Sequence, residues 1–161
     1  FGFQDYQSLN QALLMQNSRL IIRTHSLGAN LIEGEFGQIS FGSSKPAVDF
    51  NFIAPAVDVL ITDYSGIFIE FLKSNIRIAF WQYDLHEYIV ERGLSLPESI
   101  FSVGFDIKGP NDFLKLLASQ TDDDEKISAK KHWANALSEN SQTEALEKTV
   151  LEIRRRTGVH I

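Results

Sequence analysis

The sequence predicts an α/β fold in which helices cover both faces of a doubly wound parallel sheet. Two observations favour this class. Short apolar runs alternate along the chain with segments of helical periodicity. The runs are also apolar at successive positions, which is typical of strands buried on both faces. Right-handed crossovers would then place every strand-to-helix loop at one edge of the sheet.

Composition sets further bounds on the fold and on the partners. The chain has 161 residues, of which 43% are hydrophobic, and it contains 12 Phe, so we expect one globular domain over residues 1–161 with a substantial core. The net charge of −6 provides no broad basic surface, which argues against nucleic acid as a partner. The absence of Cys excludes disulfides and thiolate chemistry.

The first half of the chain contains four predicted elements. Residues 6–18 have apolar residues at helical spacing, and Asp5 is a candidate N-cap. Residues 20–22 form a short apolar run and are predicted as a strand, and residues 37–41 as a second strand. Residues 49–58 are expected to form a helical turn that Pro55 breaks.

The second half alternates more regularly. A glycine follows the helix expected at 85–92, and a proline opens the one expected at 110–119, both of which are common helix boundary signals. The other expected elements are strands at 59–62, 76–82 and 103–109, the start of a helix at 67–73, and closing helices at 125–137 and 142–155.

A polar stretch, Thr62-Asp63-Tyr64-Ser65-Gly66, interrupts the apolar residues between the strand at 59–62 and the helix that follows. Ligands of doubly wound sheets bind beyond the carboxyl ends of the strands. A helix start there would offer unpaired N–H groups and a partial positive charge to a phosphate or diphosphate. The alternative is that Asp63 or Ser65 only caps a helix. Residue types alone leave both interpretations open.

The stretch DVLITDYSGIFIEFL, followed by IAFWQYDLHEY and ERG, resembles the CDP-glycerol glycerophosphotransferase family. The turn RTH after the strand at 20–22 also fits the family pattern, and the resemblance covers roughly residues 20–119. Two departures concern the site: Gly66 replaces a second Ser, and Ser26 replaces a Pro after the motif histidine.

The resemblance implies a GT-B architecture, in which two Rossmann-like domains flank the active site. This chain looks like the C-terminal, donor-binding domain, and we expect the N-terminal domain to be missing from it, so that the fragment alone is inactive. The resemblance makes His25 the catalytic candidate. It assigns the donor diphosphate or nucleotide to Thr62, Asp63, Tyr64, Ser65, Gly66 and Arg92.

The implied activity is transfer of polyol phosphate from CDP-glycerol or CDP-ribitol to a teichoic-acid-like or capsule polymer of the cell envelope, or to a lipid-linked primer. One alternative is a sugar-nucleotide GT-B glycosyltransferase of surface polysaccharide synthesis. Another is a non-catalytic Rossmann-like binding domain.

Neither a metal ion nor another cofactor is expected, because the four His are scattered and no H-E-x-x-H spacing exists. No apolar run reaches the roughly 20 residues that span a bilayer. We therefore expect a cytoplasmic location. Three consecutive Arg near the C-terminus, 154–156, leave open a peripheral contact with the membrane face.

Overall fold

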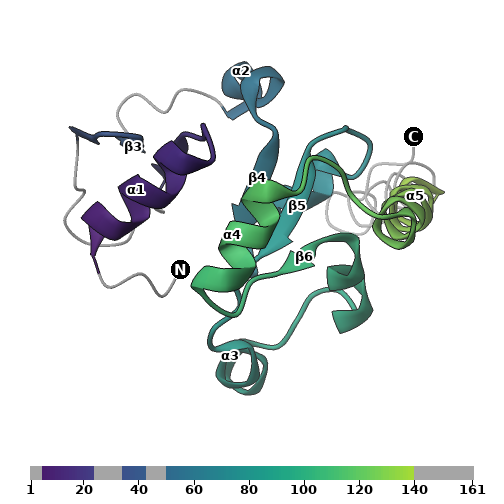
Figure 1. Cartoon of the computed structure of the whole chain (residues 1–161). Coiled ribbons are helices and arrows are strands. Elements are labelled where there is room, and N and C mark those ends of the chain that lie inside the picture. The colour runs from purple at the N-terminus through teal and green to yellow at the C-terminus, as the bar shows by residue number, and fades with distance from the viewer. Residues whose placement is uncertain (1–4, 24–33, 43–49, 140–161) are drawn as a thin grey trace, which may run out of the picture.

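The computed structural model describes residues 5–23, 34–42 and 50–139 of the chain (Figure 1). The strands in these residues form two three-stranded sheets, with the orders β1-β3-β2 and β4-β5-β6. The helices lie around and between the sheets, so the α/β class is confirmed.

The second sheet is the parallel one. It consists of β4 (Val59–Thr62), β5 (Arg77–Phe80) and β6 (Phe105–Asp106). Both of its strand pairs are parallel, and the register places Thr62 opposite Phe80. All three strands therefore end at the same edge of the sheet, as predicted for this part of the chain.

Side chains of this sheet alternate between two hydrophobic clusters. Leu60, Ile78 and Phe80 belong to one cluster, whereas Val59, Ile61 and Ala79 belong to the other. Because successive side chains of a strand point to opposite faces, each cluster covers one face. Burial on both faces explains why these strands are apolar at successive positions.

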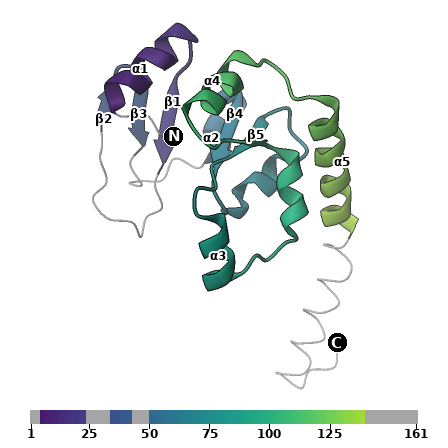
Figure 2. The same ribbon diagram turned by 60° about the horizontal axis from the view of Figure 1, so that its bottom comes forward.

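Different helices cover the two faces. The first face packs against two short 3₁₀ helices, η2 (Gly66–Phe71) and η3 (Glu98–Val103), and against α5 (Asp124–Glu139). On the second face, α4 (Pro110–Ala118) belongs to one cluster with α1 (Tyr6–Met15) and residues of the first sheet. Figures 1 and 2 both place α1 and α5 on opposite sides of the parallel sheet.

The first sheet differs from the predicted single parallel sheet. β1 (Leu20–Arg23) is parallel to β3 (Ile39–Gly42), but β2 (Gly34–Phe36) is antiparallel to β3. A tight turn joins β2 and β3, in which Gly37 has a φ of 59° and the Gln38 N–H donates to Asn10 Oδ1 over 2.6 Å. Glycine adopts this positive φ without strain, so the turn reverses the chain and adds an antiparallel strand.

The remaining elements lie at the two ends of the strands of the parallel sheet. α2 (Phe50–Ile53) and η1 (Ala54–Ala56) precede β4, and α3 (Leu85–Arg92) follows β5. Figure 1 shows α2 and α3 at opposite ends of the parallel sheet. The helix predicted at 142–155 and the three Arg at 154–156 lie outside the described residues.

The segment predicted to start a helix at 67–73 is the 3₁₀ helix η2, which has 6 residues. Phe68 and Phe71 are both buried in it. Residues three apart lie on the same side of a 3₁₀ helix, so this geometry directs both rings into one cluster. Both rings therefore anchor η2 to the same face of the parallel sheet.

Candidate functional site

The polar stretch 62–66 lies at the carboxyl edge of the parallel sheet. Thr62 is the last residue of β4, and its carbonyl accepts a hydrogen bond of 2.9 Å from the Trp81 N–H, directly after β5. The loops after two neighbouring strands thus leave the sheet at the same level. This is the edge at which ligands of parallel sheets bind.

Asp63 organises the turn at this edge. Its carboxylate accepts a hydrogen bond of 2.9 Å from the Ser65 N–H, and both residues are exposed. The expectation that the amides of this stretch are unpaired is therefore wrong for Ser65. The Ser65 side chain makes no capping hydrogen bond to η2, so it is the hydroxyl of Ser65 that is presented to solvent.

Gly66 is exposed and opens η2. The first N–H groups of such a helix have no partner within the helix. A Cβ added to Gly66 would meet only Ile69 Cδ1, at 3.8 Å, which is an ordinary contact. Neither backbone strain nor crowding therefore requires glycine here, although its absent side chain leaves the backbone open to a ligand.

Tyr64 is held from two directions by α3. Its hydroxyl donates to the Asp84 carboxylate and accepts from the Asp84 N–H over 3.3 Å. Its ring stacks on Tyr88, with 4.0 Å between ring centroids and 20° between planes. Burial, followed by the hydrogen bond to Asp84, raises the pKa of Tyr64, so the hydroxyl stays protonated at neutral pH.

A small hollow of about 140 Å³ adjoins this loop. It brings Tyr64 and Gly66 together with Tyr88 and with Gly93, the residue that ends α3. Most other lining side chains are apolar: Phe68, Ile69, Leu94, Leu96, Ile100 and Phe101.

Arg92 precedes Gly93, is exposed, and forms no ion pair with any other described residue. The structure thus places Arg92 next in the chain to a residue of the hollow that Tyr64 and Gly66 line. His25 lies outside the described residues.

Gln82 is a polar residue at this edge that the sequence analysis did not select. It follows β5 and is partly buried, and its Nε2 atom has no hydrogen-bond partner among the described residues. A buried amide donor without a partner is rare in folded proteins. The signal in the sequence was a polar side chain at the end of an apolar run predicted as a strand, residues 76–82, as Thr62 is at the end of 59–62.

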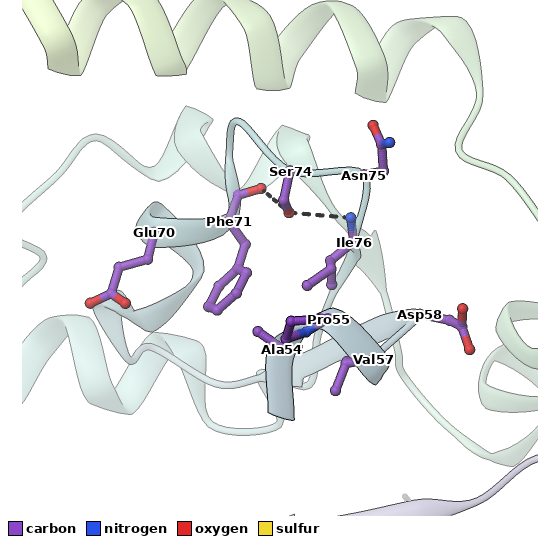
Figure 3. Close-up of a pocket in the computed structure, with 9 residues that line it drawn as sticks. All are labelled: Ala54, Pro55, Val57, Asp58, Glu70, Phe71, Ser74, Asn75 and Ile76. Atoms are coloured by element: carbon purple, nitrogen blue, oxygen red, sulfur yellow. Dashed lines mark hydrogen bonds between the residues drawn. The ribbon is translucent and has the colours of Figure 1, made fainter. Parts of the chain in front are cut away.

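A second hollow lies at the opposite edge of the sheet and is larger, about 440 Å³ (Figure 3). Its lining comes from the residues that precede β4 and β5 and from the end of η2. Figure 3 shows the carboxylates of Asp58 and Glu70 at its two sides, pointing outward. No Lys, Arg or His lines it, so it is poorly suited to a diphosphate.

Two further features bear on the class of protein. No group of three or more His, Cys, Asp or Glu within residues 5–23, 34–42 and 50–139 is arranged to hold a metal ion. In the same residues, every helix is too short or too polar to cross a membrane.

Comparison with known proteins identifies the family. The family model of CDP-glycerol:poly(glycerophosphate) glycerophosphotransferase matches residues 4–152, which include β4, the stretch 62–66 and α3. No curated protein sequence matches the chain. Because the family model covers far more than half of the 161 residues, the chain belongs to the CDP-glycerol:poly(glycerophosphate) glycerophosphotransferase family.

Proposed function

We propose that this chain is the donor-binding domain of a transferase that uses a CDP-activated polyol. Family membership implies CDP-glycerol glycerophosphotransferase activity in the synthesis of a teichoic-acid-like polymer. The donor is CDP-glycerol or CDP-ribitol. The acceptor is a hydroxyl of the growing polymer or of a lipid-linked primer.

The reaction is a phosphoryl transfer at the diphosphate of the donor. The acceptor oxygen attacks the phosphorus that carries the polyol, and a new P–O bond forms. The bond between that phosphorus and the bridging oxygen breaks, and CMP leaves with both electrons of the bond. The acceptor proton passes to a base. The protein must therefore stabilise negative charge on phosphoryl oxygens and hold the attacking hydroxyl.

The residues at the carboxyl edge have matching roles in this proposal. The hydroxyl of Ser65 and the N–H of Gly66 donate to diphosphate oxygens, and the Arg92 guanidinium supplies a positive charge. Thr62 and Asp63 fix the turn, and Tyr64 forms one side of the hollow. His25 accepts the acceptor proton or balances the departing diphosphate.

The observation that carries the proposal is the family match over residues 4–152. The local geometry supports it, because Tyr64, Gly66 and the end of α3 border one hollow. With a net charge of −6 the protein as a whole repels an anionic donor, so binding depends on such local donors and on Arg92. We further propose that a second Rossmann-like domain of a GT-B enzyme binds the acceptor, and that this chain alone turns over little.

Calorimetric titration of the full chain tests the donor. We expect binding of CDP-glycerol or CDP-ribitol, weaker binding of CMP, and a loss of about tenfold in affinity for Ser65→Ala. The matched control is Ser119→Ala, which removes an exposed hydroxyl at the end of α4. Preferential binding of a UDP-sugar would instead identify a glycosyltransferase, and binding of no nucleotide would identify a non-catalytic domain. Either result overturns the proposal.

A further inference from the structure

Asp84 breaks a local rule of helix formation. It occupies the N-cap position of α3, where an Asp side chain normally accepts a hydrogen bond from the first turn of the helix. Here the side chain makes no such capping bond and instead accepts from the hydroxyl of Tyr64. Violations of this kind concentrate at functional sites, where another requirement outweighs helix stability.

Tyr88 completes the contact with Tyr64. It lies four residues after Asp84, so both residues project from the same side of α3. Asp84 binds the hydroxyl of Tyr64, and Tyr88 stacks on its ring. Both translation and rotation of the Tyr64 side chain are therefore restricted by one helix.

The contact joins two loops that belong to different strands. Tyr64 follows β4, whereas α3 follows β5 and ends at Arg92. Movement of α3 would thus displace the exposed Ser65 and Gly66, which directly follow Tyr64, together with Arg92. Catalytic and binding groups must be held within a fraction of an ångström, usually by neighbouring residues with fixed side chains.

We infer that Asp84 and Tyr88 are positioning residues of the donor site, which act by holding Tyr64 so that Ser65, Gly66 and Arg92 keep a fixed relative arrangement. The assignment of these three residues to the donor rests on the proposed function. The contact by which α3 holds Tyr64 does not depend on the proposed function, and it can be tested without any ligand.

Amide hydrogen exchange of the full chain tests the positioning directly. In Tyr64→Phe the ring can still stack on Tyr88, but the hydroxyl is lost, so Asp84 is released to cap α3. We expect the Ser65 amide, which donates to Asp63, to exchange about tenfold faster, whereas the midpoint of urea unfolding stays close to that of the unchanged protein. Tyr6→Phe, on α1, is the control, and the Ser65 amide should exchange in this variant as it does in the unchanged protein. Unchanged exchange at the Ser65 amide in Tyr64→Phe overturns the inference.

A pair of substitutions at Tyr88 separates positioning from general stability. Tyr88→Phe keeps the ring and should retain the affinity for CDP-glycerol, whereas Tyr88→Leu removes the stacking and should weaken it about tenfold. If both variants bind as the unchanged protein does, the inference is wrong. If the unchanged protein does not bind CDP-glycerol, the proposed function fails, but the exchange experiment still decides whether Tyr64 is held.

Discussion

At the scale of single residues, the site combines one fixed side chain with two exposed residues. Tyr64 is bound by Asp84 and Tyr88, and Ser65 and Gly66 follow it directly at the surface. The Ser65 N–H already donates to the Asp63 carboxylate, so in the proposed function the Ser65 hydroxyl is the more important donor to a phosphate. A side chain with a hydroxyl at position 66 would add a second hydrogen-bond donor for a phosphate at this turn.

Gly66→Ser restores the second serine that is usual in the family pattern. An added Cβ at this position meets only an ordinary contact, so we expect the free energy of unfolding to change by less than about 0.5 kcal/mol. One further hydroxyl donor should strengthen CDP-glycerol binding by about 1 kcal/mol, or roughly fivefold. Gly109→Ser, also in open space but at the start of α4, should leave the affinity unchanged. Weaker binding by Gly66→Ser would mean that the ligand requires close backbone approach here.

Tyr64 also predicts how stability depends on pH. Burial raises its pKa above the ordinary 10.0, so the folded state keeps this proton at pH values at which the unfolded state releases it. Stability from this group is complete below pH 10 and declines as the pH rises above 10. In Tyr64→Phe this decline should be shallower, as measured by urea unfolding at pH 9 to 11. An identical decline in both proteins would contradict the raised pKa of Tyr64.

At the scale of elements, a buried lysine on α5 forms hydrogen bonds that hold this helix against the parallel sheet. Lys130 Nζ donates to the carbonyls of Ser74 and Ile76, over 3.2 and 2.8 Å, in the loop that leads into β5. The Asp122 carboxylate lies 3.8 Å from the same nitrogen, and the two side chains are 11% and 8% exposed for Asp122 and Lys130. Burial lowers the pKa of Lys130, whereas Asp122 opposes that shift.

Replacement of Lys130 should therefore destabilise the protein strongly. Lys130→Met keeps the length of the side chain but leaves a buried carboxylate and two carbonyls without their cation. We expect a loss of about 3 kcal/mol in the free energy of unfolding, measured in urea. Lys131→Met, an exposed neighbour on the same helix, should change it by less than about 0.5 kcal/mol. Equal changes in the free energy of unfolding for the two substitutions would show that the hydrogen bonds of Lys130 do not stabilise the packing of α5.

Sequence periodicity predicted the longer elements well. The helix expected from residue 6 is α1, capped by Asp5 through a hydrogen bond of 2.7 Å from the Ser8 N–H. The helix expected at 125–137 is α5 (Asp124–Glu139), and the strand expected at 59–62 is β4. Caps and apolar spacing act over a few residues, so they can be read without knowledge of the fold.

Features that depend on long-range contacts could not be read from the sequence. The start of an α-helix expected at 67–73 is the 3₁₀ helix η2, and a two-residue turn adds the antiparallel β2. The family pattern points to Tyr64 as a site residue, but nothing in the sequence indicates that Asp84, 20 residues later, binds it. The Asp84 side chain had an equally good local partner in α3, and only the packing of α3 on the loop decides between them.

At the scale of the whole molecule, the two edges of the parallel sheet differ in chemistry. The carboxyl edge gathers the family motif, an aromatic pair and an arginine, whereas the opposite edge holds a larger hollow flanked by Asp58 and Glu70. In the proposed function the donor binds at the smaller of these two hollows. The ends of the parallel strands and the position of the family motif favour the carboxyl edge.

Titration of the ¹⁵N-labelled full chain with CDP-glycerol, followed by NMR, tests this assignment most directly. The account predicts that the backbone amides of Ser65, Gly66 and Arg92 shift together along one binding curve, while the amide of Asn75, at the opposite edge, stays in place. Saturable binding that moves Asn75 and leaves Ser65 and Gly66 unchanged would contradict it.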